Sequence, residues 1–208
     1  MSTIVIQTFL TLDGVMQAPG GPEEDTSGNF THGGWHAPHF DEALGEAVGG
    51  WTAGAEGLLL GRRTYDIFAA HWPRVPQDHP DVEVARILNS LPKYVASRTR
   101  TSLEWQNSTL LGDDVPAAVA KLREQPGGEI HVIGSGDLAQ TLIRHDLVDE
   151  YRLTIAPVVL GSGRRLFAEG AVPTGLKLVE SSTTPAGVLV CVYRRSGEVG
   201  YGSFALEN

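Results

Sequence analysis

The sequence predicts an α/β fold with a mixed, mostly parallel central sheet, helices on both faces and an antiparallel hairpin at its C-terminal end. Two observations predict this fold. Short, nearly continuous apolar runs alternate with segments of helical periodicity, and such runs are typical of buried parallel strands. Near the C-terminus the alternation stops, and two β-rich runs flank the turn sequence Pro185-Ala186-Gly187.

The expected strands are short runs rich in β-branched and aromatic residues. In chain order they are Thr3 to Leu10, Gly57 to Leu60, Lys93 to Ser97, Ser108 to Leu111, Glu129 to Ile133, Tyr151 to Val159, Leu176 to Thr184 and Val188 to Arg195. The hairpin formed by the last two strands closes the sheet.

The segments between these strands have helical spacing. They are Phe40 to Thr52, Thr64 to Ala70, Val82 to Ser90, Val115 to Glu124 and Asp137 to His145. Asp81 and Asp114 precede two of them and are natural N-cap residues. Gly20 to Gly34 is a long irregular segment, which is typical of a lid or a binding loop.

Length and composition predict one globular domain over residues 1–208, since 41% of the residues are hydrophobic and 20% are charged. The formal net charge of −9 argues against nucleic acid or an anionic membrane as partner, because both require a broad basic surface. The single cysteine, Cys191, excludes an intrachain disulfide and favours a reducing compartment. Without a leader-like or membrane-spanning apolar run in the sequence, we expect a cytoplasmic protein.

The first candidate site is the corner where the apolar run Leu58 to Leu60 passes through Gly61 into Arg62, Arg63 and Thr64. Glycine permits close approach of a ligand, Thr64 is placed to cap the following helix, and the first amides of a helix attract negative charge. The two arginines suggest a phosphate monoester. A solvated basic turn on an ordinary strand-to-helix connection is an equally open interpretation of this corner alone.

A second corner follows the strand Glu129 to Ile133, where Gly134-Ser135-Gly136-Asp137-Leu138-Ala139 matches the G-x-G-x-x-A form of a dinucleotide fingerprint. The corner comes late in the chain and lacks the acidic residue that ends the second strand of a Rossmann domain. A plain helix start capped by Ser135 is the alternative. A third strand end supplies Ser97 and Arg98 at the carboxyl edge of the sheet, where open α/β sheets bind ligands.

In combination and in this order, these corners resemble the dihydrofolate reductase fold, and within it the riboflavin-biosynthesis reductase-like branch. Three further segments match the pattern of that branch. They are Thr11-Leu12-Asp13-Gly14-Val15, Val148-Asp149-Glu150-Tyr151-Arg152-Leu153-Thr154-Ile155, and Pro157-Val158-Val159-Leu160-Gly161-Ser162-Gly163 before Leu166-Phe167. The resemblance extends from Ile4 to about Arg195.

The resemblance implies a binding site for NADPH. It assigns the 2′-phosphate and pyrophosphate to the corner of Gly61, Arg62, Arg63 and Thr64 together with Ser97 and Arg98. The second corner, Gly134, Ser135, Gly136, Asp137 and Leu138, would lie against the pyrophosphate and nicotinamide. An arginine contact to the 2′-phosphate is worth about 1.5 to 3 kcal/mol, so we expect NADP(H) rather than NAD(H).

The same resemblance places Asp13, Gly14 and Met16 near the nicotinamide and the substrate. Trp35 is either an aromatic wall for a flat substrate or a core residue. For the catalytic proton the candidates are Asp13 and two acids of the helix that begins near Phe40, Asp41 and Glu46, although acids in a first turn often only complement the helix dipole.

The spacing of His32, His36 and His39 is too loose to indicate a metal site, and we expect these histidines to line a cleft or face solvent. The chain also lacks the Pro-Cys-x-x-Cys motif of an attached zinc deaminase.

Three functions are consistent with the sequence. The favoured one is an NADPH-dependent reductase of a small heterocyclic substrate, such as a pterin, a pyrimidine or a flavin-like ring. The others are a non-catalytic nucleotide- or flavin-binding protein, and a conventional Rossmann NAD enzyme that uses only the second corner. The resemblance also suggests a homodimer, formed through the C-terminal strands and the segment Gly197 to Asn208.

Overall fold

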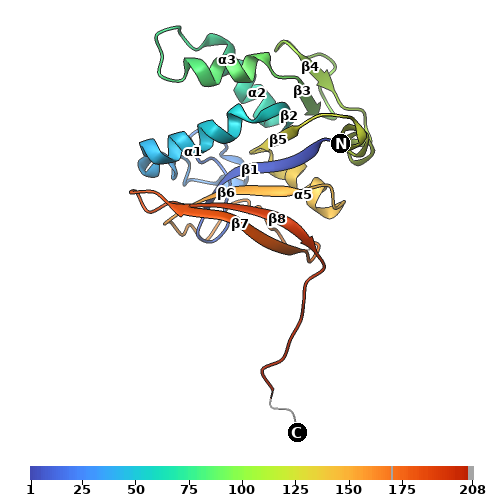
Figure 1. The fold of residues 1–208 in the computed structure, drawn as a ribbon. Coiled ribbons are helices and arrows are strands. Elements are labelled where there is room, and N and C mark those ends of the chain that lie inside the picture. Colours follow the sequence, from blue (N-terminus) through green and yellow to red (C-terminus); the bar gives the residue numbers. More distant parts are fainter. Residues whose placement is uncertain (170, 206–208) are drawn as a thin grey trace.

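The computed structural model describes residues 1–169 and 171–205. Its centre is a sheet of strand order β4-β3-β2-β5-β1-β6-β8-β7, which runs from top to bottom in Figure 1. The strands are β1 (Thr3–Thr11), β2 (Ala55–Gly61), β3 (Lys93–Ala96), β4 (Ser108–Leu110), β5 (Glu129–Ile133), β6 (Glu150–Ala156), β7 (Gly175–Thr183) and β8 (Leu189–Gly197). From β4 to β6 all neighbours pair in parallel, and β8 and β7 pair antiparallel. The predicted fold class, including the C-terminal hairpin, is confirmed.

The helices are α1 (Glu42–Ala53), α2 (Arg62–His71), α3 (Val82–Ser90), α4 (Val115–Glu124) and α5 (Gly136–Arg144), together with the short 3-10 turns η1 (Ser27–Asn29), η2 (Ala37–His39) and η3 (Trp72–Arg74). In the described part of the chain, no helix has both the length and the apolar character needed to cross a bilayer.

The strand β2 shows how the sheet is covered on both faces, because its successive leucines enter different core clusters. Leu59 packs in the cluster that includes residues of α4 and α5. Leu58 and Leu60 pack on the other face with Tyr65 of α2 and Leu88 of α3. The helix α1 also lies on this second face, where Leu44 packs against Val190 of β8 and Val188 just before that strand. Helices on both faces explain why the parallel strands are continuous apolar runs.

Most element boundaries lie within two residues of the prediction, and two of the differences have an identifiable physical cause. The helix α2 begins at Arg62 rather than Thr64, with an extended Gly61 at the N-cap position, and the Thr64 hydroxyl makes a different contact described below. The strand β6 ends at Ala156 rather than Val159, because Pro157 has no N–H to donate and the Val158 N–H turns back to the Ala156 carbonyl.

The N-cap at Asp114 is confirmed, since its carboxylate accepts from the Ala117 N–H at 3.0 Å. Asp81 occupies the N-cap position of α3 as predicted, but it does not cap the helix with its side chain. The side chain lies instead beside His79.

Tyr65 links α2 to the loop after β3 by one buried hydrogen bond. Its hydroxyl oxygen accepts from the Trp105 backbone N–H at 2.9 Å, and Tyr65 is only 1% exposed. We expect Tyr65→Phe to lower the free energy of unfolding by about 1 to 3 kcal/mol, because the Trp105 N–H is left buried without an acceptor. Urea denaturation measures the change, with Tyr201→Phe, on an exposed tyrosine, as the control. An unchanged midpoint would contradict this account.

Candidate functional site

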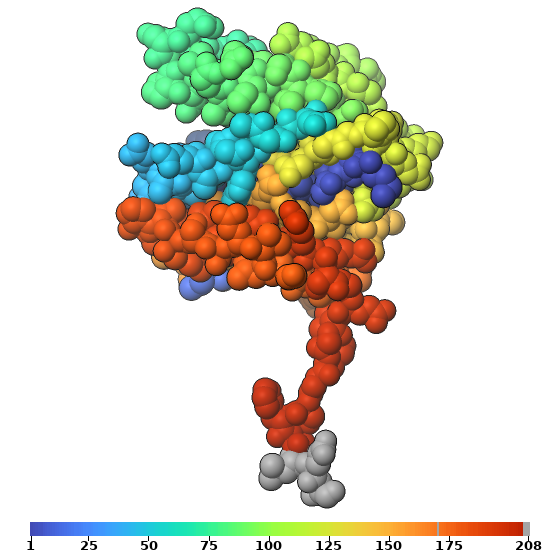
Figure 2. Space-filling view, in the orientation of Figure 1, coloured from blue at the N-terminus to red at the C-terminus, as the bar shows by residue number. Residues whose placement is uncertain are grey.

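A cavity of about 1260 Å³ lies at the carboxyl edge of the parallel strands. It begins where β2, β3 and β5 end and continues into a cleft between α1 and α3, visible as a hollow between these helices in Figure 2. Its lining includes all the residues predicted to bind the cofactor: Gly61, Arg62, Arg63, Thr64, Ser97, Arg98, Gly134, Ser135, Gly136, Asp137 and Leu138. The structure therefore brings the three predicted corners into one cavity.

The two glycine corners are joined by side-chain hydrogen bonds. The Ser135 hydroxyl oxygen accepts from the Gly61 N–H at 2.9 Å and donates to the Ile133 carbonyl at 3.0 Å. The Thr64 hydroxyl oxygen accepts from the Ser135 N–H at 3.1 Å. Both hydroxyls thus hold the corners together, so neither caps its helix as the sequence suggested, and the N-termini of α2 and α5 open side by side into the cavity.

The second corner has an uncommon backbone. Gly134 and Ser135 both have left-handed conformations, each with φ 57°. Glycine adopts this conformation at little cost, whereas a serine there is strained, and such strain is concentrated at functional sites. The first amides of α2 and α5 have no acceptor within their own helices, and the dipoles of both helices favour negative charge at this point.

The basic side chains around the corners differ in how far they are already paired. The Arg63 guanidinium lies 2.5 Å from the Asp25 carboxylate and 3.1 Å from the Ser27 hydroxyl. Burial raises the pKa of Asp25, but hydrogen bonds from Ser27 and the charge of Arg63 outweigh it and hold that pKa below its usual range. Arg62 pairs with Asp66 at 3.1 Å on the exposed surface of α2. Arg98 makes no ion pair with any carboxylate in the described residues, and it is exposed.

The hydroxyl of Ser97 shapes the third strand end. Its oxygen accepts from the Arg100 N–H at 3.0 Å and from the Thr99 N–H at 3.3 Å. This turn sets the direction of the neighbouring Arg98.

The cleft between α1 and α3 is lined mainly by apolar and aromatic side chains. Phe9, His36 and Phe40 form an aromatic group, with the rings of Phe9 and His36 centred 4.2 Å apart. On α1, Gly45 and Gly49 line the same cleft, and the absence of side chains at these two positions keeps it open. The cleft therefore suits a flat, apolar ring.

Sequence reasoning missed Gln7, Phe9 and Thr154, which line this cleft, whereas His36, one of the histidines expected to line a cleft or face solvent, does line it. A signal was present for Gln7, which ends the apolar run Ile4 to Ile6. No periodicity marks His36, because its burial depends on how the loop before α1 folds back over β1.

The predicted catalytic carboxylates do not line the cavity. Asp13 is engaged by the Thr11 hydroxyl and by the Gly161 and Leu160 N–H groups, and these bonds hold its pKa well below the usual range despite some burial. Asp41 caps α1 by accepting from the Leu44 N–H, and it also accepts from the Ala186 N–H. Glu46 lies exposed on α1. The structure gives these acids structural or surface positions.

Only some of the residues predicted to bind the substrate line the cavity. Met16 lines the cavity, whereas Gly14 and Trp35 do not. Trp35 is buried and its indole N–H donates to the Gln17 carbonyl at 2.7 Å, so it is a core residue rather than an aromatic wall. Within the described residues, no three His, Cys, Asp or Glu side chains converge in a way that would hold a metal ion.

His36 gives the site a pH-dependent contribution to stability. It is 2% exposed, and burial, together with the nearby His39, lowers its pKa to about 4. Between about pH 6.5 and pH 4 the unfolded chain binds a proton that the folded chain does not, so stability falls as the pH decreases. The loss over this window is about 3 kcal/mol. We expect His36→Phe to reduce this pH dependence in urea denaturation, and the exposed-site control His32→Gln to retain it. An equal pH dependence in His36→Phe would contradict the assignment.

Comparison with known proteins places this geometry in a family. The model of the RibD C-terminal domain matches residues 2–190. The uncharacterized protein YyaP of Bacillus subtilis (strain 168) is 35% identical over 140 residues, which cover 67% of this chain and 74% of YyaP. A putative riboflavin biosynthesis protein from Shewanella sp. PV-4 has a similar fold, with a TM-score of 0.64, 21% identity, and coverage of 93% of this chain and 99% of that one. A pyrimidine reductase-like protein from Corynebacterium diphtheriae also has a similar fold, with a TM-score of 0.60, 13% identity, and coverage of 94% of this chain and 92% of that one. The chain belongs to the RibD C-terminal domain family.

Proposed function

We propose that this protein is an NADPH-dependent reductase that transfers hydride to a small heterocyclic substrate. The observation that carries the proposal is the cavity itself, in which two helix N-termini and a basic strand end are continuous with an aromatic cleft. Membership of the RibD C-terminal domain family supports a reductase-like activity.

The corners fit the phosphates of a dinucleotide. The N-termini of α2 and α5 offer unpaired amides and favourable dipoles to a pyrophosphate, and hydrogen bonds between the corners keep these amides in place. Arg98 adds a guanidinium that is free of described ion pairs. When bound, NADPH supplies the hydride, and the chain's own residues orient the two reactants and exclude water.

Preference for NADPH over NADH would come from the arginines at the first and third corners. Arg62 and Arg98 are more available than Arg63, which already shares Asp25 with Arg164. One charge-assisted contact to the 2′-phosphate corresponds to roughly tenfold to hundredfold in affinity.

A non-catalytic binding protein is the second candidate function. The observation in its favour is that Asp13, Asp41 and Glu46 lie outside the cavity lining, which leaves the source of the substrate proton unassigned. Tight binding of NADPH without its oxidation across a panel of pterins, pyrimidines and flavins would support this candidate.

Loss of the two more available arginines should weaken binding of NADPH selectively. For Arg62→Ala combined with Arg98→Ala we expect roughly tenfold to hundredfold weaker NADPH binding, with a smaller change for NADH, which lacks the 2′-phosphate. Quenching of tryptophan fluorescence measures both affinities, since Trp51 and Trp72 line the cavity. Arg86→Ala is the matched control, because Arg86 pairs with Glu83 outside the cavity. Equal affinities for both nucleotides in the wild-type protein would contradict the assignment.

We also propose that the protein forms a homodimer through its C-terminal hairpin. Leu176, Leu178, Val179 and Leu189 on β7 and β8 are 37 to 48% exposed, an unusual set of apolar side chains for an edge of a sheet. The segment after β8 leads away from the body in Figure 1 and carries the exposed Tyr201 and Phe204. A second copy of the chain would bury these groups.

Light scattering tests the dimer, with an expected mass of twice 22.3 kDa. We expect Leu178→Lys combined with Val179→Lys to give a monomer, because two charges then lie in the proposed interface. Leu12→Lys, at an exposed leucine outside the hairpin, is the control and should stay dimeric. A wild-type protein with the mass of one chain would show this proposal to be wrong.

A further inference from the structure

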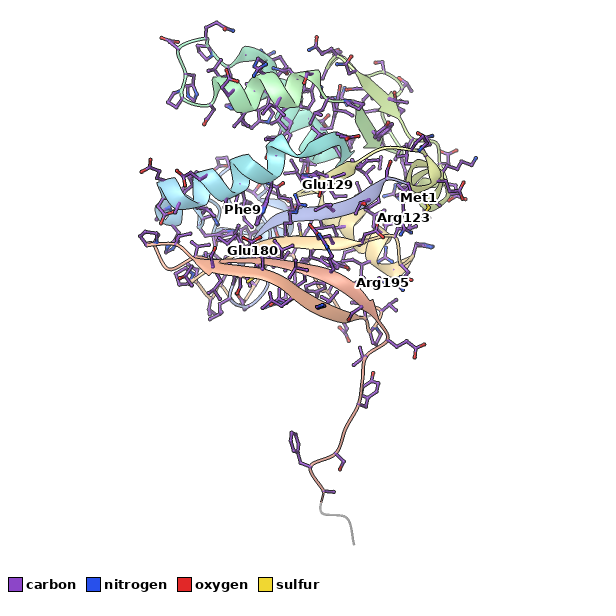
Figure 3. All side chains as sticks on the ribbon, viewed as in Figure 1. Met1, Phe9, Arg123, Glu129, Glu180 and Arg195 are labelled. Carbon is purple, nitrogen blue, oxygen red and sulfur yellow. The ribbon has the colours of Figure 1, made fainter. Side chains whose placement is uncertain are left out.

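Gln7 places a side-chain amide at the floor of the cleft. Gln7 lies on β1 beside Ile133 of β5 and Arg152 of β6, and it is 6% exposed. Phe9, two residues further along β1, lies on the same face of the sheet and also lines the cleft. Figure 3 shows Phe9 on β1 and Glu129 on the neighbouring β5. A polar group in this position is costly unless it is paired, so its partners define its role.

The Gln7 amide is held from behind by a series of hydrogen bonds, of which the first is buried and the others are partly buried. One of its terminal atoms lies 3.1 Å from Nδ1 of His131, which is fully buried. The other ring nitrogen, Nε2, lies 2.9 Å from the Glu129 carboxylate. Arg152 donates to that carboxylate at 2.6 Å and to Glu150 at 2.7 Å.

The charges of these hydrogen-bonded groups determine which nitrogen of His131 carries a proton. Burial raises the pKa of Glu129, but the bond from Arg152 and the contact with His131 outweigh it, so Glu129 is a carboxylate that can only accept. Burial lowers the pKa of His131, the charge of Arg152 lowers it further, and the opposing effects of Glu129 and Glu150 do not restore it. His131 is therefore neutral near pH 7, with its proton on Nε2 and a bare acceptor at Nδ1.

An acceptor at Nδ1 requires a donor from Gln7. With Nε2 donating to Glu129, an Oε1 atom beside Nδ1 would need a second proton on the ring, which only a charged imidazolium has. Rotating the Gln7 amide by 180° exchanges its oxygen and nitrogen without changing its shape, and the NH₂ group then faces Nδ1 of the neutral ring. In that orientation the NH₂ group donates to His131, and the carbonyl oxygen of Gln7 is presented to the cleft as an acceptor.

The surroundings of this acceptor indicate what it binds. Thr154 pairs with Phe9 across the strands, is 1% exposed, and its hydroxyl has no hydrogen-bond partner in the described residues. The neighbouring His36 is neutral near pH 7, and its Nε2 likewise has no described partner. Both atoms are buried in the structure, so a ligand reaches them only when a lining side chain moves aside. Phe40, which is half-exposed and lies beside His36, is placed to make this movement.

We propose that Gln7 is a specificity-determining residue whose carbonyl oxygen accepts a hydrogen bond from a ring N–H of an uncharged, lactam-type heterocycle. This inference rests on the proposed reductase function, because it describes the substrate end of the same cavity. His131 and Glu129 are positioning residues that fix the orientation of the amide. The aromatic group of Phe9, His36 and Phe40 supplies the flat contact for the ring.

Binding of two matched probes tests the hydrogen bond to the ring. The probes are lumazine, a flat pteridine with lactam N–H groups, and its N,N′-dimethyl derivative, which lacks them. We expect the wild-type protein to bind lumazine roughly tenfold or more tightly, since one buried hydrogen bond is lost in the derivative. Gln7→Leu should abolish the preference, and Gln106→Leu, at an exposed amide on the loop before β4, should retain it. Equal binding of the two probes, binding of neither, or a preference that persists in Gln7→Leu overturns the proposal.

A second measurement tests, without any ligand, whether His131 and Glu129 orient the Gln7 amide as proposed. Nitrogen NMR of the imidazole rings at pH 7 should show His131 protonated on Nε2 and bare on Nδ1, and Gln7→Glu should shift the ring toward the doubly protonated form. A doubly protonated His131 in the wild-type protein overturns the proposed orientation. Titration with NADPH is independent of both measurements. If the protein does not bind NADPH, the proposed function is wrong. If it binds NADPH normally but the probe result is negative, only this inference is wrong.

Discussion

The cavity depends on the hydrogen bonds that join the first corner to the second. Ser135 accepts from the Gly61 N–H, and Thr64 accepts from the Ser135 N–H. Because β2 and β5 are neighbours in the sheet, these two bonds fix the starts of α2 and α5 relative to each other. Two helix N-termini that would separately be ordinary strand-to-helix turns thereby become one surface suited to an extended anion.

The order of the strands decides what lies next to that surface. The strand β1 is placed between β5 and β6, so its Gln7 and Phe9 form the floor of the cleft that begins where the corners end. The helix α1 contributes glycines to this cleft, and its acids are used elsewhere, with Asp41 holding the helix start and the turn at Ala186. The result is an end of the cavity that is apolar and aromatic, with polar side chains at its floor.

Much of the fold could be predicted from the sequence, because apolar runs of strand length and helices of clear periodicity are local signals. The capping role of Asp114 follows from its position alone, and the corners that line the cavity follow from the physical use of glycine and arginine at a strand end. The failures concern side chains whose roles depend on distant parts of the chain. Thr64 is predicted to cap its own helix but bonds to Ser135, 71 residues away. Asp41 is a candidate for the catalytic proton but bonds to Leu44 and Ala186. Spacing carries no information about such partners.

A structure of the protein crystallised with NADPH is the decisive test of the cavity as a dinucleotide site. We expect density for the pyrophosphate between the N-termini of α2 and α5, for the 2′-phosphate beside Arg62 and Arg98, and for the nicotinamide at the entrance to the cleft. Density confined to Gly134 to Ala139, with the adenosine end far from Arg62, would contradict this expectation.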